Sequence, residues 1–213
     1  MKRNTFYLAL RRWWVGFKLI FKDYSYLNST GFIRSHQLIE PVDAKSNAIP
    51  WMNYAFVELL NERLNKDLRL FEYGAGFSSL YFAERVGAVV SIEYDKAWET
   101  KLRELLKPCS NHKLIVEPVG EKYIGAATSE GKAFDVVLVD GRERVACFKN
   151  GLEALTERGV VILDDSDREE YQEAFEIARA NGFRHLRISG LKPFSFKREE
   201  STLFYRKENC FNI

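Results

Sequence analysis

The sequence predicts a doubly wound α/β fold, with a mostly parallel seven-stranded sheet, helices on both faces and an N-terminal helical extension. Five apolar, strand-like runs alternate with stretches of helical spacing and are joined by short turns, which is typical of a parallel sheet. Two further apolar runs near the C-terminus are separated by only about ten residues, too few for the crossover that parallel strands need. We therefore expect the last strand to be antiparallel and inserted beside its predecessor.

The first element is an amphipathic helix over residues 4–22. One face carries Phe6, Leu10, Trp13, Phe17 and Ile20 at steps of three and four, and Arg11, Lys18 and Lys22 lie on the opposite side. Two interpretations stay open. Such a helix can lie in a membrane interface with its cations toward anionic headgroups, or it can dock on the protein's own core or on a second subunit. No run of about 18 apolar residues predicts a spanning helix.

Residues 23–49 read as an irregular, lid-like connection, since they contain Gly31, Pro41 and several Ser and Asn. Pro50 suits the first position of a helix that continues from Trp51 to Leu64. We divide the chain into an N-terminal part, 1–49, and a ligand-binding domain, 50–213.

From residue 68 the strands and helices alternate. The strands are predicted over 68–73, 88–94, 112–118, 134–140 and 159–165, and the helices over 77–86, 96–107, 145–157 and 167–181. Residues 119–132 give a weak helix, and the two closing strands are predicted over 183–189 and 201–206. The loop between the closing strands should emerge beside the ends of the parallel strands, where Lys192, Lys197 and Arg198 would border a site.

Each of the five parallel strands ends on a carboxylate. These acids are Glu72, Glu93, Glu117, Asp140 and the pair Asp164 and Asp165. In an open parallel sheet, ligands bind at the carboxyl ends of the strands. The sequence therefore predicts a nucleotide-type site along one edge of the sheet.

A glycine turn follows the first of these strands. Gly74 and Gly76 allow the main chain to approach a ligand, and Phe77, Ser78 and Ser79 then begin a helix whose free N–H groups favour an anionic group. Ser79 takes the place of the third glycine of a dinucleotide fingerprint, which weakens an NAD or FAD interpretation.

The acids beside this turn predict the kind of ligand. Glu93 lies seventeen residues after Gly76, near the distance at which an acid bonds a ribose diol. Glu72 can hold the amides of the turn or meet an ammonium group. A ligand with a ribose, an amino-acid end and a positive centre satisfies this set, and S-adenosylmethionine has all three.

At these residues the chain resembles the class I S-adenosylmethionine-dependent methyltransferases, whose fold is Rossmann-like. The likeness covers residues 68–206 and is carried by the segments EYGAGFSS, SIEYD and FDVVLVD, the last ending at Asp140. It implies that the cofactor binds at Glu72, Tyr73, Gly74, Ala75, Gly76, Ser78, Glu93 and Tyr94. It also implies that residues around 118–120 approach the adenine.

Methyl transfer to a hydroxyl needs a base, and Asp140 is the predicted catalytic residue, with Glu143 and His36 as further candidates. Asp140, Asp164 and Asp165 could also hold a divalent metal, as in the similar catechol-type methyltransferases. Two departures from that group argue against a metal: Asp165 stands where an Asn is usual, and Glu143 where a Lys is usual. We therefore expect S-adenosylmethionine as the cofactor and no metal ligand set.

Charge and composition limit the partners. The 32 basic and 30 acidic side chains nearly balance, which gives a nucleic-acid role no support, although the first 22 residues carry +6 and the remainder −4. The three cysteines form no CxxC pair, which is typical of reduced thiols in a cytoplasmic protein. We expect a small-molecule or saccharide acceptor, and a cytoplasmic location that includes the inner membrane face if residues 4–22 bind lipid. Two alternatives stay open: a nucleotide-dependent oxidoreductase or epimerase, and a non-catalytic binding protein on the same fold.

Overall fold

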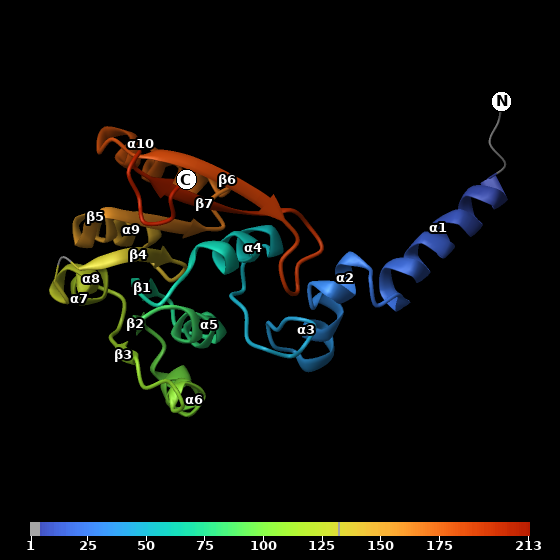
Figure 1. The fold of residues 1–213 in the computed structure, drawn as a ribbon, viewed down its shortest axis with the longest axis horizontal. Helices are drawn as coiled ribbons and strands as arrows, with labels where there is room; N and C mark the ends of the chain where they lie inside the picture. Colours follow the sequence, from blue (N-terminus) through green and yellow to red (C-terminus); the bar gives the residue numbers. More distant parts are fainter. Residues whose placement is uncertain (1–4, 132) are drawn as a thin grey trace.

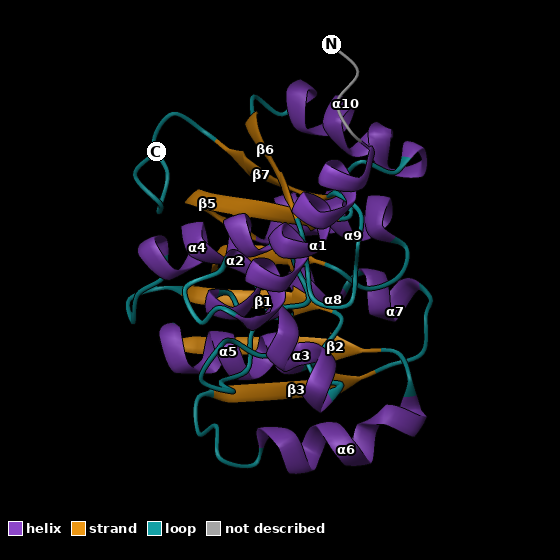
Figure 2. Cartoon of the chain, turned by 90° about the vertical axis from the view of Figure 1, so that its right-hand side faces the viewer, coloured by secondary structure: helices purple, strands orange, loops and turns teal. Residues whose placement is uncertain are grey.

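Seven strands form one mixed sheet in the computed structural model, which describes residues 5–131 and 133–213. The strands are β1 Arg69–Tyr73, β2 Ala88–Glu93, β3 His112–Val116, β4 Phe134–Val139, β5 Leu155–Asp164, β6 Arg184–Gly190 and β7 Glu199–Tyr205. They lie in the order β3-β2-β1-β4-β5-β7-β6, which runs from the bottom to the top of the sheet in Figure 2, where β4 is not labelled. β1 to β5 pair in parallel, and β7 is antiparallel to both β5 and β6. The predicted sheet and its inserted last strand are confirmed.

The described residues also form ten α-helices and one 3-10 helix. The α-helices are α1 Thr5–Phe21, α2 Tyr26–Ser29, α3 Phe32–Leu38, α4 Tyr54–Arg63, α5 Phe77–Arg85, α6 Lys96–Leu106, α7 Glu121–Ile124, α8 Ala126–Ser129, α9 Arg144–Ala154 and α10 Gln172–Ala180; the 3-10 helix η1 is Glu169–Tyr171. Asn4, the first residue of the helix predicted over 4–22, lies outside the described residues. So does Lys132, the last residue of the weak helix predicted over 119–132. No described helix combines the length and the apolar character that crossing a bilayer requires.

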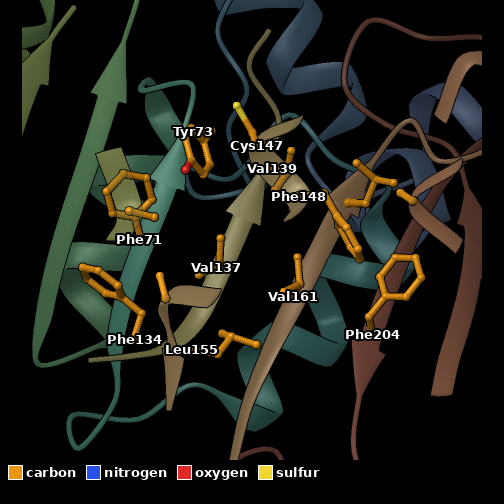
Figure 3. Close-up of a cluster of buried hydrophobic side chains, with 14 of the residues drawn as sticks. Phe71, Tyr73, Phe134, Val137, Val139, Cys147, Phe148, Leu155, Val161 and Phe204 are labelled. Carbon is orange, nitrogen blue, oxygen red and sulfur yellow. The ribbon is translucent and has the colours of Figure 1, made fainter. Parts of the chain in front are cut away.

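Side chains alternate between the two faces of the sheet, so the core has two main layers. In β4, for example, Val137 and Val139 face a layer that includes α9 and α10, whereas Val136 and Leu138 face a layer that includes α4 and α5. Figure 3 shows side chains of the first layer, where Phe148 of α9 meets Phe204 of β7 with ring centroids 4.8 Å apart. The central strands β1, β2 and β4 are mostly buried and apolar because helices cover both faces of the sheet.

Several predicted boundaries were wrong, including the start of β5, which lies at Leu155 and not at residue 159. The helix expected from Trp51 begins instead at Tyr54, because the side chain of Asn53 accepts a hydrogen bond from the Phe56 amide and caps it. The helix expected over 145–157 ends at Ala154, because Leu155 already pairs with Phe134 of β4. The segment expected as a helix over 167–181 starts with a turn and η1 before α10.

The segment 23–49 was predicted to be irregular, but it contains the short helices α2 and α3. The seven residues of α3 are too few to show a repeating apolar pattern in the sequence. Ser35 holds the helix against the following chain, since its hydroxyl donates to the Val42 carbonyl and accepts from the Val42 amide. Gly31 precedes α3 with a φ of +88°, and a side chain there would collide with the Val42 carbonyl.

Candidate active site

The loops after β1 and β4 touch at two glycines. The Gly74 amide donates to the Ile92 carbonyl, and the Asp140 amide donates to the Tyr73 carbonyl, so the ends of β2, β1 and β4 are joined. Gly74 has a φ of +95°, and a Cβ placed there would lie 3.1 Å from the Cα of Gly141. Both the backbone angle and the close approach require glycine at position 74.

A cavity of about 670 Å³ opens above these loops, at the carboxyl ends of the parallel strands, and it is large enough for a nucleoside-sized ligand. The glycine turn and the residues beyond it form one wall, the ends of β2 and β4 form the floor, and side chains before α4 and after β6 form the far wall. The lining residues are Ile39, Pro41, Trp51, Gly74, Ala75, Gly76, Phe77, Ser78, Glu93, Tyr94, Trp98, Lys101, Asp140, Gly141, Arg142, Arg144, Arg168 and Phe194.

Glu93 is buried at the end of β2, and its carboxylate organises the turn. One oxygen accepts from the Ala75 amide at 3.1 Å, and the other accepts from the amides of Tyr94 and Asp95 at 2.9 Å each. A carboxylate has about four acceptor positions, so one remains for a ligand hydroxyl. The predicted ribose acid therefore lies at the cavity with acceptor capacity to spare.

Glu72 and Tyr73 lie below the cavity and are not among its lining residues. One oxygen of Glu72 accepts hydrogen bonds from the hydroxyls of Ser79 in α5 and Ser91 in β2, and the other has no partner among the described residues. Complete burial raises the pKa of Glu72 to about 7. Tyr73 points to the opposite face, where its hydroxyl donates to the Ile124 carbonyl.

Asp140 reaches the cavity from the end of β4. One of its carboxylate oxygens accepts from Arg144 in the first turn of α9, at 2.8 Å. Burial raises the pKa of Asp140, and the Arg144 guanidinium opposes that rise. Of the two further candidate bases, Glu143 is exposed at the start of α9, and His36 lies among the rings of Phe194 and Phe196.

The three strand-end aspartates gather as predicted, with one carboxylate oxygen from each within 4.8 Å of the others. Cations of the chain itself already hold them. Lys192 pairs with Asp164 and Asp165, and Arg144 pairs with Asp140 and Asp165. Burial acts to raise the pKa of Asp165, but hydrogen bonding and attraction from Lys192 hold it below its usual value. A divalent ion would have to displace the buried Arg144 and the partly buried Lys192, so this donor set does not fit a metal.

The far wall is aromatic. Trp51 donates from its indole nitrogen to the Pro193 carbonyl at 2.6 Å, and its ring lies 5.2 Å from that of Phe194. Lys192, one of the three basic residues expected there, anchors the same loop after β6 to Asp164 and Asp165 but does not line the cavity. Lys197 pairs with Glu199 instead, and neither Lys197 nor Arg198 lines the cavity.

The structure brings together most of the predicted site. Six of the eight predicted cofactor residues line the cavity together with Asp140, namely Gly74, Ala75, Gly76, Ser78, Glu93 and Tyr94. Residues 118–120 are exposed and lie outside the lining. The sequence interpretation missed the arginines: Arg142 donates to the Tyr94 hydroxyl at 3.1 Å, and Arg144 is buried among the aspartates. The sequence did contain one signal for Arg144: it lies four residues after Asp140 at the start of a predicted helix, a spacing at which an ion pair can form.

No family model and no curated sequence match this chain. Solved structures do match. An rRNA methylase from Streptococcus thermophilus is 12% identical and superposes with a TM-score of 0.56 over 70% of this chain and 92% of its own. A protein from Klebsiella pneumoniae, provisionally classed as an O-methyltransferase, is 15% identical with a TM-score of 0.55 over 93% of this chain and 96% of its own.

A third similar structure was solved with a ligand. It is a protein from Streptococcus mutans, provisionally classed as a methyltransferase and in complex with SAH, 13% identical with a TM-score of 0.52 over 70% of this chain and 94% of its own. These likenesses agree with the sheet order and with the antiparallel strand between β5 and β6. The chain has the fold of the class I S-adenosylmethionine-dependent methyltransferases.

Proposed function

We propose that this protein is an S-adenosylmethionine-dependent methyltransferase that acts on a hydroxyl oxygen of a small-molecule or saccharide acceptor. The observation that carries the proposal is the joining of the glycine turn, Glu93 and Asp140 around one cavity, on a sheet with the strand order of that fold. The fold alone supports methyl transfer in general, and the geometry of the cavity supports the roles of these residues.

The cofactor would lie along the glycine turn. Glu93 keeps one acceptor position for a ribose hydroxyl. The amides of Phe77 and Ser78 belong to the first turn of α5, where N–H groups have no partner inside the helix and favour a carboxylate. Glu72 acts from below, because its bonds to Ser79 and Ser91 fix α5 and β2 under the turn.

The acceptor would lie between Asp140 and the aromatic wall of Trp51 and Phe194. When bound, S-adenosylmethionine supplies the methyl group, and the protein's task is to align the acceptor oxygen and to take its proton. Of the three strand-end aspartates, Asp140 is the one that lines the cavity, and its raised pKa makes it a stronger base than an exposed aspartate.

Calorimetry with S-adenosylmethionine, S-adenosylhomocysteine and NAD, run in parallel, tests the cofactor. We expect both adenosyl sulfur compounds to bind and NAD to give no signal. Glu93→Gln keeps the shape of the side chain and should weaken binding about 10- to 100-fold, the loss expected for one charged hydrogen bond. Glu117→Gln is the matched control, because Glu117 directly follows β3 but does not line the cavity. Binding of NAD alone would contradict the proposal.

Asp140→Asn tests the base once an acceptor has been found by screening hydroxyl compounds for methyl incorporation. The rate of methyl transfer should fall about 10²- to 10⁴-fold, as for the loss of a general base. Cofactor affinity should stay within a few-fold of the unsubstituted protein. A rate that is unchanged by this substitution would remove Asp140 from the mechanism.

A further inference from the structure

Helix α1 projects away from the sheet (Figure 1), and its large apolar side chains are exposed. Among its residues whose side chains the structure describes, none is buried, and none belongs to a core cluster. Trp13 is 74% exposed and Phe21 is 65% exposed. Apolar side chains in such number on one surface helix mark an interaction surface.

The apolar residues follow the helical repeat. Leu10, Trp13, Phe17 and Ile20 form one stripe, and the rings of Trp13 and Phe17 stack with centroids 6.1 Å apart. The stripe runs along most of α1. Its residues are exposed and belong to no core cluster, so the protein's own core does not cover it.

The cations of the same segment have no acidic partners. Arg11, Arg12 and Lys18 of α1 and the following Lys22 form no ion pair in the described part of the chain. The first 22 residues contain no acid and carry +6, whereas the remaining residues carry −4. The Lys18 ammonium lies 3.6 Å from the centre of the Trp14 ring, so cation and aromatic ring share one edge of the helix.

The C-terminal end of α1 is held by capping bonds to the next helix. Asn28 donates from its side-chain amide to the carbonyls of Ile20 and Lys22, and the Ser25 hydroxyl donates to the Leu19 carbonyl. These bonds satisfy carbonyls that a helix end leaves unpaired. The ring of Tyr26 in α2 meets that of Tyr54 in α4 edge-on at 6.4 Å, so α1 is connected to the sheet domain through folded structure.

We propose that α1 binds the surface of a bilayer that contains anionic lipids. The helix lies in the plane of the membrane, with Trp13 and Phe17 among the acyl chains and Arg11 and Lys18 among the headgroups. A second copy of the chain fits this surface less well, because its α1 would bring the same unpaired positive charge. An anionic lipid surface satisfies the apolar stripe and the cations together.

Vesicle co-sedimentation of the full-length protein tests this surface. We expect binding to vesicles of phosphatidylcholine mixed with phosphatidylglycerol, and little binding to pure phosphatidylcholine. The combined changes Arg11→Gln, Arg12→Gln and Lys18→Gln should lower the bound fraction about tenfold or more. Trp13→Ala with Phe17→Ala should lower it comparably. Raising the salt concentration should release the unsubstituted protein.

The matched control is the combination Lys107→Gln, Lys149→Gln and Lys207→Gln, which removes three exposed, unpaired cations from the sheet domain and should leave vesicle binding unchanged. Calorimetry with S-adenosylmethionine should be the same for all variants, so a failure here is separate from a failure of the proposed function. Equal binding to both kinds of vesicle, or no binding to either, would overturn the proposal. So would a dimer in analytical ultracentrifugation that Trp13→Ala with Phe17→Ala dissociates while the protein leaves vesicles unbound.

Discussion

At the scale of single residues, the site depends on the contact between Gly74 and Gly141. A Cβ added to either glycine would come within 3.2 Å of the backbone of the other, and Gly74 also has a positive φ. Gly76 differs, because its φ of −176° is extended and a Cβ there would meet no protein atom within 4 Å. Gly74 is therefore required by the backbone conformation, whereas Gly76 borders the open space of the cavity.

Gly74→Ala should therefore destabilise the protein by about 2–4 kcal/mol, since backbone strain and a clash add. Gly76→Ala should cost less than about 1 kcal/mol but weaken S-adenosylmethionine binding, because the new methyl group occupies the cavity wall. Chemical denaturation and calorimetry on the two variants measure both effects. Equal losses of stability would show that the two glycines do the same work.

Buried Glu72 predicts a pH dependence of stability. Its pKa is raised by burial from 4.5 to about 7. Between these two pH values, the folded state keeps a proton that the unfolded state has lost. The stabilisation is complete below pH 4.5 and is lost as the pH rises through 7, which corresponds to about 3 kcal/mol. Glu72→Gln should remove this fall. The difference in unfolding free energy between the two proteins from pH 4 to 8 measures it, and parallel curves would contradict it.

The sequence predicted Glu93 and the glycine turn because their types and spacing are local. It could not separate Glu72, whose carboxylate faces Ser79 and Ser91, from an acid that faces the ligand, since both end a strand. It also missed Arg144. This residue pairs with both Asp140 and Asp165, and the two acids come together only because β4 and β5 are neighbours in the sheet. Side-chain direction and cross-strand neighbours are tertiary properties.

At the scale of elements, Asn53 joins α4 to the far end of the sheet. Its side-chain oxygen accepts from the Phe56 amide, and its amide group donates to the Ile188 carbonyl and the Ser201 hydroxyl, each at 3.0 Å. The residue is fully buried. One side chain thus begins a helix and ties it to β6 and β7, beside the loop that carries the aromatic wall.

Asn53→Ala should lower the unfolding free energy by about 2–4 kcal/mol, because a cap is lost and buried partners lose their bonds. Asp95→Ala is the matched control. Asp95 caps α6 through a single exposed bond to the Ala97 amide, and its loss should cost only about 1 kcal/mol. Urea denaturation of both variants measures the costs. Similar values would show that the bonds of Asn53 to β6 and β7 contribute nothing.

Strands were predicted more accurately than helix ends. A continuous run of buried β-branched residues is a clear strand signal, as in β4, which was predicted over 134–140 and spans Phe134–Val139. The helix α3 did not, because it is short and is fixed by Ser35 and Val42 instead of by an apolar stripe. The start of α4 at Tyr54 could be predicted only by knowing that the side chain of Asn53 caps the helix by accepting a hydrogen bond from the Phe56 amide. Pro50 alone predicted an earlier start.

At the scale of the whole molecule, α1 is separate from the sheet that builds the cavity. Removing residues 1–22 deletes no buried residue in the described part of the chain. We expect the shortened protein to keep its melting temperature within about 3 °C, since only the bonds at Ser25 and Asn28 are lost. Its affinity for S-adenosylmethionine should be unchanged. Differential scanning calorimetry and titration calorimetry check both, and a cooperative loss of folding would place α1 in the core.

The position of β7 between β5 and β6 also sets an order of assembly during translation. Chains emerge from the ribosome N-terminus first, and β6 has no neighbour in the sheet other than β7. A nascent chain that lacks residues 199–205 can pair β1 to β5 and shape the glycine turn, but β6 stays unpaired and the loop bearing Phe194 has nothing to return to. The side of the cavity formed by the glycine turn is thus available to form early, and the side formed by Phe194 closes only with the final strand.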